Sequence, residues 1–255
     1  MPQMNSLSRF AVIVAVTFAS SMAGLVIQML LPVQIMTESR GAIGGIVGLI
    51  TLLLALVLGL LIWASYGVFS TQISEAQSLG PSVLELDLAL KRYGPETAQG
   101  RAALREGILR SRERFFGAGH AKPIVFTFAD SHNAMEATTA FFNSLTPATD
   151  EQRELLATAK QLRTSIVQTQ LLMSRQLANP IPQILLVAVV SWSALLFLGH
   201  GLMATFNALT VVAEALGAIS VSSAIFLIAE FSEPYSGLYK IQPHGIDEVI
   251  AELGK

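Results

Sequence analysis

The residues of this chain that could do chemistry are few, and most of them are charged side chains on one polar segment. Arg101, Arg105 and Arg112 share a face if this segment is helical. Such a cluster can concentrate anions through its positive potential, or it can contact lipid headgroups. The same pattern is typical of a solvated helix surface, and Glu106 can pair with Arg110 at four-residue spacing. An anion-attracting role for the three arginines is therefore one of three open interpretations.

A single carboxylate, Glu214, interrupts an apolar stretch from about Phe206 to Ile228. An ionisable group inside a bilayer costs about 2.5 to 3.5 kcal/mol on insertion scales, so it usually faces a protein interior or water. We interpret Glu214 as a candidate proton or cation site, or as a polar contact to a partner helix. Since it lies only about two turns into the stretch, it could instead reach the interface. In an anion pathway it would have to be protonated or turned away, because a carboxylate repels anions.

Motifs for catalysis, cofactor binding and metal binding are missing from the sequence. The absence of Cys excludes disulfides, thiolate metal sites and Cys nucleophiles. The four His residues have no ligand spacing, and there is no Gly-rich phosphate loop, nucleophile elbow or HExxH motif. Glu230 and Glu233 together fall short of the six to eight oxygen ligands that calcium prefers. We expect no enzymatic activity, no cofactor and no bound metal.

Membrane helices must position these residues, because the composition does not fit a soluble chain. The 255 residues are 52% hydrophobic and 13% charged, with a mean hydropathy of +0.57. Soluble domains carry about twice that charged fraction. The net charge of -2 lacks the basic balance of a nucleic-acid-binding protein. We therefore expect the lipid bilayer, and not nucleic acid, as a partner.

Four apolar segments are long enough to cross a bilayer, which takes about 20 helical residues. They are Phe10 to Leu31, about Ala42 to Trp63, Pro180 to Leu198, and Phe206 to Ile228. The first segment is too long for the apolar region of a signal peptide, so we expect it to be retained. The predicted fold class is all-α: an integral membrane protein with four transmembrane helices and a helical cytoplasmic insertion between the second and third.

Four crossings place both termini on the same side as the insertion. Of the 16 Lys and Arg, 12 lie between 67 and 179, and Arg9, Lys240 and Lys255 join them on that side, leaving Arg40 alone opposite. The positive-inside rule then makes the termini and the insertion cytoplasmic. The predicted organisation is a transmembrane hairpin at 1–66, a cytoplasmic helical region at 67–179, a second hairpin at 180–230 and a cytoplasmic tail at 231–255.

The cytoplasmic region is predicted to be helical, because apolar residues recur at three- and four-residue spacing. One stripe runs from Leu79 to Tyr93 and another from Leu155 to Leu177. We expect the two stripes to pack together in a helical hairpin or bundle. Between them the sequence predicts helices at Pro95 to Phe116 and at Ser131 to Leu145, with a loop at 117–123.

Four glycines near the start of the second crossing, Gly41, Gly44, Gly45 and Gly48, form two pairs at four-residue spacing. Helix backbones can approach closely where side chains are missing, so this spacing predicts a helix-packing face. The alternative is a glycine stripe that lines a pore.

Several short strings carry a resemblance that covers most of the chain. They are Leu54 to Leu60 followed by Ser70-Thr71-Gln72 and Glu75; Leu86-Asp87 with Leu90 to Glu96; and Ala224 to Glu230 leading to Pro234-Tyr235-Ser236-Gly237. In order and spacing they resemble the bestrophin-like domain family of bacterial multi-pass membrane proteins.

This resemblance implies four membrane helices with a helical cytoplasmic insertion, in the bacterial inner membrane. It also implies a distant relation to bestrophins, which are pentameric anion channels with a hydrophobic pore constriction. A smooth helix is implied where Gly80 and Pro81 stand, and we expect these two residues to interrupt it.

Three functional hypotheses follow. The first is an oligomeric anion channel or transport component, in which the arginines concentrate anions and the apolar crossings form a constriction that gates by wetting. The second is a non-conducting structural subunit that packs onto a larger membrane complex through the glycine face. The third is a proton-coupled carrier centred on Glu214.

Overall fold

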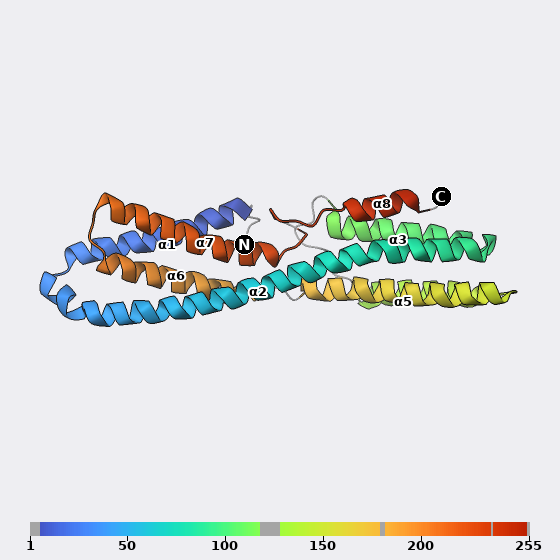
Figure 1. The fold of residues 1–255 in the computed structure, drawn as a ribbon, viewed down its shortest axis with the longest axis horizontal. Helices are drawn as coiled ribbons and strands as arrows, with labels where there is room; N and C mark the ends of the chain where they lie inside the picture. The colour runs from blue at the N-terminus through green and yellow to red at the C-terminus, as the bar shows by residue number, and fades with distance from the viewer. Residues whose placement is uncertain (1–5, 118–127, 179–181, 236, 254–255) are drawn as a thin grey trace. The chain divides into compact units, whose positions relative to one another are not determined.

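The structure is a computed structural model that describes residues 6–117, 128–178, 182–235 and 237–253. All regular elements in these ranges are helices, which confirms the predicted all-α fold (Figure 1). The elements are α1 Ser6–Leu30, α2 Val33–Tyr93, the 3-10 turn η1 Pro95–Thr97, α3 Ala98–Phe116, α4 Phe128–Ser144, α5 Asp150–Ala178, α6 Gln183–Met203, α7 Ala208–Phe231 and α8 His244–Glu252.

The chain divides into two compact units. The membrane unit comprises residues 1–69, 181–233 and 237–239, and the bundle unit comprises residues 70–180, 234–236 and 240–255. Helices α1, α6 and α7 belong to the membrane unit, whereas η1, α3, α4, α5 and α8 belong to the bundle unit. Helix α2 contributes residues to both.

Four helices of the described chain are long and apolar enough to cross a membrane, as predicted. These are α1, α2, residues Ile184–Met203 of α6, and α7. Only between 17% and 33% of each apolar stretch is buried inside the chain. Exposed apolar surface on this scale is unfavourable in water, so the membrane unit requires a hydrocarbon environment.

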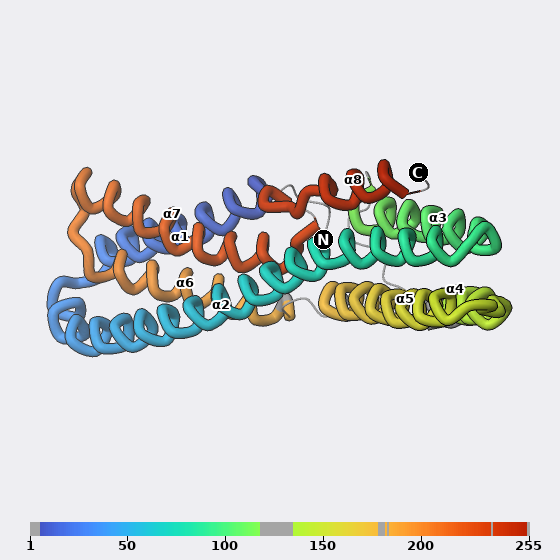
Figure 2. Tube along the Cα trace, turned by 45° about the vertical axis from the view of Figure 1, so that its right-hand side comes forward, coloured from blue at the N-terminus to red at the C-terminus, as the bar shows by residue number. Residues whose placement is uncertain are grey.

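Helices α1 and α6 meet at backbone distance. A Cβ atom at Gly24 would lie 2.2 Å from the carbonyl oxygen of Leu198, and one at Gly201 would lie 2.1 Å from that of Ser21. Both glycines are therefore required by the close approach of the two backbones. Figures 1 and 2 show α1 lying alongside α6 and α7.

The other contacts of the membrane unit combine a few hydrogen bonds with apolar packing. The hydroxyl groups of Thr17 on α1 and Ser222 on α7 are fully buried and lie 3.3 Å apart in a hydrogen bond. Arg40 on α2 donates from Nη2 to the carbonyl oxygen of Met203, at the end of α6, over 3.1 Å. The apolar core is drawn from α2, α6 and α7 and contains Leu54, Leu58, Val189, Leu196, Phe197, Ala218, Ile225 and Ile228.

Helix α2 continues without a break through Gly80 and Pro81, so the expected interruption is wrong. Pro81 lies on the exposed side of the helix, where the carbonyl group that its missing N–H leaves free can bond to water. Gly80 lies against α8, since a Cβ atom there would be 3.2 Å from Cγ2 of Val249. The two residues therefore fit a straight helix that α8 approaches closely.

Both predicted stripes lie in the core of the bundle unit. Leu79, Val83, Leu86, Leu90 and Tyr93 are all buried on α2. On α5 the buried residues include Ala159, Ile166 and Met173, while Leu155, Leu162 and Leu177 pack against the same core.

The intervening segments differ from the prediction at their ends. The predicted helix from Pro95 to Phe116 is observed as η1 and α3, and α4 begins three residues before the predicted Ser131. Residues 118–123 of the predicted loop lie outside the described residues. Helix α8 was not predicted, and its Ile246, Val249 and Ile250 cover the bundle core.

The contact at Gly24 yields a test of the membrane unit. We expect Gly24→Ala to destabilise the protein by about 1 to 3 kcal/mol, because its methyl group meets backbone that cannot move aside. Gly59→Ala is the matched control, since a Cβ atom at Gly59 meets nothing within 4 Å. Thermal unfolding in detergent should show a lower midpoint for Gly24→Ala only; equal midpoints for both variants would contradict the backbone contact.

Candidate functional site

Glu214 lies in the membrane unit, on α7, about two turns after the helix begins. Helix α7 begins directly after Asn207 because the side chain of Asn207 caps it, accepting a 2.8 Å hydrogen bond from the backbone N–H of Thr210. Glu214 is half-buried, and no residue in the described ranges forms an ion pair or hydrogen bond with it. Its role as a proton or cation site stays a prediction.

The three predicted arginines lie on α3 in the bundle unit, in different surroundings. Arg101 makes a two-pronged ion pair with Asp87 of α2, with Nε to Oδ1 at 2.7 Å and Nη2 to Oδ2 at 2.8 Å. Both side chains are largely buried, and the hydrogen bond to Asp87 raises the pKa of Arg101. This pair fixes the start of α3 against α2.

Arg112 forms a similar pair with Asp247 of α8, with Nε to Oδ1 at 2.5 Å and Nη2 to Oδ2 at 3.2 Å. The hydrogen bond from Arg112 lowers the pKa of Asp247. Their side chains are 36% and 40% exposed, so the pair contributes at most about 1 kcal/mol. It joins α8 to α3.

Arg105 is exposed and has no carboxylate partner in the part of the chain that the structure describes. Two of the three positive charges are thus balanced by aspartates, and Arg105 is the member of the cluster that faces solvent. Local spacing could not reveal the aspartates, because they are 14 and 135 residues away along the chain. Whether the cluster attracts anions stays a prediction.

The glycines of the predicted packing face have almost no neighbours among the residues that the structure describes. A Cβ atom at Gly41, Gly45 or Gly48 would meet nothing within 4 Å, and one at Gly44 would touch only Sδ of Met203, at 3.5 Å. The close contact between membrane helices is made instead by Gly24 and Gly201, which sequence spacing did not single out.

The same side of α2 continues as an uncovered row of leucines at four-residue spacing. Leu52, Leu56 and Leu60 are 72%, 61% and 57% exposed. No charged residue stands between Arg40 and Glu75. We call this surface the α2 face and define it by Gly41, Gly45, Gly48, Leu52, Leu56 and Leu60.

Sequence reasoning missed a buried polar network in the bundle unit. The Tyr235 hydroxyl donates to Oε1 of Gln72 over 2.9 Å, and Gln72 is fully buried. Nε2 of Gln72 donates to Oε1 of Gln176 at 2.5 Å and to the carbonyl oxygen of Met173 at 3.3 Å. The sequence signal that could have revealed this network was the presence of polar residues on helix faces that are otherwise apolar and buried.

Glu75 lies at the edge of this network. Nε2 of Gln176 donates to its Oε1 over 3.4 Å, whereas its Oε2 is buried without a partner in the described chain. Burial raises the pKa of Glu75, and the hydrogen bond from Gln176 acts in the opposite direction. Burial, and then the negative charge of Glu75, raise the pKa of Tyr235.

Glu230, in the last turn of α7, and Glu233, just after this helix, make structural contacts in the membrane unit. The backbone N–H of Leu238 donates to Oε2 of Glu230 over 2.5 Å, and Gly237 adopts a φ of 89° in the turn between them. Oε2 of Glu233 accepts a 3.2 Å hydrogen bond from Nη1 of Arg9. Within the described ranges no group of three or more His, Asp or Glu side chains could hold a metal ion.

Comparison with known families matches the chain to a bestrophin-like domain. The model of the bestrophin-like domain covers residues 13–246, and so includes all the strings on which the sequence resemblance rests. No curated protein and no solved structure matches the chain.

Removal of one hydroxyl tests the polar network. Tyr235→Phe leaves Oε1 of Gln72 buried without its donor, which we expect to cost about 1 to 2 kcal/mol. For a chain of this size the thermal midpoint should fall by about 2 to 8 °C. Tyr239→Phe is the control, because Tyr239 is exposed; an equally large fall for that variant would contradict the assignment.

The raised pKa of Glu75 predicts a pH-dependent gain in stability for Glu75→Gln. The ionised form of Glu75 is less stable in the folded protein than in the unfolded chain. Above the pKa that Glu75 has in the folded protein, its charge therefore lowers the free energy of unfolding of the wild type. The penalty shrinks as pH falls and disappears near the ordinary value of 4.5. Denaturation from pH 8 to 4.5 should show Glu75→Gln more stable at high pH and the difference closing on acidification; a constant difference would argue against burial as the cause.

Proposed function

This chain belongs to the bestrophin-like family, and from that relation we propose that copies of it assemble into an anion channel or transport component of the bacterial inner membrane. In this proposal the termini and the bundle unit are cytoplasmic, as the distribution of Lys and Arg favours.

The α2 face is the observation that supports conduction best. It is apolar, carries no charge and is not covered by any described residue of the single chain. Arranged around a common axis, several copies of this face would place glycines at one end of a passage and rows of leucine farther along it. A narrow leucine ring excludes water and gates by wetting, and no carboxylate on it repels an anion.

The charged candidates have secondary roles in this mechanism. Arg105 is exposed on α3, and its charge would raise the anion concentration on the cytoplasmic side. Glu214 would have to be protonated or turned away from the passage, because its charge opposes anion entry.

The test is chloride current from purified protein in planar bilayers. We expect Leu56→Ser to raise the current several-fold, since a hydroxyl group on the α2 face lowers the barrier to wetting. Leu216→Ser on α7 is the control, because Leu216 is equally exposed and lies off the α2 face. Silence of both wild type and Leu56→Ser, with several anions and at both polarities, would contradict conduction.

The alternative function is a non-conducting subunit of a larger membrane complex. The glycines of the α2 face favour it, because small residues with open space above them can accept a foreign helix as readily as a second copy. The mass and composition of the detergent-solubilised particle distinguish the two functions. A closed homo-oligomer supports conduction, whereas foreign chains in fixed stoichiometry support the accessory role.

A further inference from the structure

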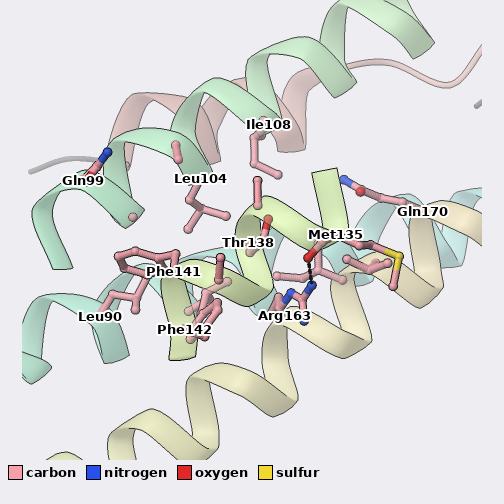
Figure 3. A pocket seen from close by; sticks show the side chains of 18 of the residues that line it. Leu90, Gln99, Leu104, Ile108, Met135, Thr138, Phe141, Phe142, Arg163 and Gln170 are labelled. Carbon is pink, nitrogen blue, oxygen red and sulfur yellow. Dashed lines mark hydrogen bonds between the residues drawn. The ribbon is translucent and has the colours of Figure 1, made fainter. Parts of the chain in front are cut away.

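The bundle unit contains a cavity of about 650 Å³ between α2, α3, α4 and α5 (Figure 3). Its volume falls in the range of about 300 to 1,000 Å³ that is typical of small-molecule sites. Most of the wall is apolar. The apolar side chains that the close view labels are Leu90, Leu104, Ile108, Met135, Phe141 and Phe142.

One positive charge in the cavity wall has no anionic partner among the described residues. Arg163 of α5 donates from Nη2 to the carbonyl oxygen of Met135 and to Oγ1 of Thr139, both at 3.0 Å. Its Nε is buried and has no hydrogen-bond partner, and the described residues place no carboxylate beside it. Arg101 and Arg112, by contrast, are both paired with aspartates. A partly buried guanidinium that has only neutral partners is stabilised when an anionic group binds to it.

The charges in the cavity wall disfavour ligands that carry more than one negative charge. Its other cation, Arg110, is already paired with Glu106 over 2.9 Å. One unbalanced positive charge therefore faces a long apolar wall, with Thr138 and Gln170 as further polar side chains. This pattern fits a ligand with one negative charge and a long apolar body.

We propose that this cavity binds a single-chain amphiphile with one anionic head group, of the long-chain fatty acid class. The carboxylate pairs with the guanidinium group of Arg163, and the alkyl chain lies along the leucine and phenylalanine side chains of α2, α3 and α4. This proposal does not depend on whether the protein conducts.

Two glycines of α3 show how the cavity can be closed without disturbing the fold. A Cβ atom at Gly107 would meet nothing within 4 Å, although Gly107 lines the cavity. A Cβ atom at Gly100 would lie 2.2 Å from Cζ of Phe141. Gly107→Leu therefore adds volume to empty space, whereas substitution at Gly100 would create a clash. Ala102→Leu is the matched control, because Ala102 is exposed on the same helix and does not line the cavity.

The experiment uses full-length protein in phosphatidylcholine nanodiscs with a diazirine-bearing palmitic acid as the probe. After illumination, mass spectrometry locates the labelled peptides. Probe dissolved in the bilayer labels the membrane helices of every variant, and this labelling serves as the internal reference. We expect additional labelling of α3 and α4 residues that line the cavity, reduced about tenfold or more in Gly107→Leu and unchanged in Ala102→Leu.

The head group is tested by competition and by a charge variant. Unlabelled palmitate should displace the probe from the cavity of the wild type at about a tenth of the concentration that hexadecanol requires. Arg163→Gln keeps a hydrogen-bond donor and loses the charge, so this difference should disappear in it. Equal competition by palmitate and hexadecanol in the wild type, cavity labelling that survives Gly107→Leu, or labelling confined to the membrane helices would each overturn the proposal.

Discussion

Contact between the backbones of α1 and α6 is the interaction on which the membrane unit depends. In hydrocarbon, helices gain little from burying apolar side chains, so they associate through close packing and a few hydrogen bonds. Gly24 and Gly201 make that packing possible. The Thr17–Ser222 hydrogen bond then joins α7 to α1, and Val47 of α2 packs on Gly199 of α6. The outer side of α2 takes no part in these contacts, which is why one apolar helix face is left for lipid or for another chain.

The bundle unit is specified differently, by polar contacts placed within an apolar core. Asp87, Gln72 and Tyr235 stand in the strings that resemble the bestrophin-like family, and each makes a contact between elements distant in sequence. Glu230 belongs to the same strings and closes the turn at Gly237. These residues therefore explain the resemblance by their part in the architecture.

The sequence could predict the features that depend on local spacing. The four crossings follow from the length of apolar runs, and the buried stripe from Leu79 to Tyr93 follows from helical periodicity. Prediction failed where a distant contact decides the outcome. The break expected at Pro81 is absent because the residue lies on the solvent side of a helix held by its buried face. Helix α8 was missed because nine residues are too few to establish a period.

The candidate site was less predictable than the fold for the same reason. Spacing on α3 placed the arginines on one predicted helix face, but the aspartates that balance Arg101 and Arg112 come from other helices. Small-residue spacing identified the glycines of α2, yet the glycines in contact, Gly24 and Gly201, lie on two different helices. A single contact between two helices produces no periodic pattern in the sequence of either helix.

The hydrogen bond between Arg40 and the carbonyl group of Met203, at the end of α6, bears on how the chain enters the membrane. In the proposed orientation, with both termini cytoplasmic, this guanidinium is carried across the bilayer, against the usual preference of cations for the cytoplasmic side. The peptide dipoles of α6 leave a partial negative charge at its carboxyl end, where Arg40 binds. That compensation exists only after the second pair of crossings has inserted. The positive charge of Arg40, in the first half of the chain, is therefore compensated only after the second half has inserted into the membrane.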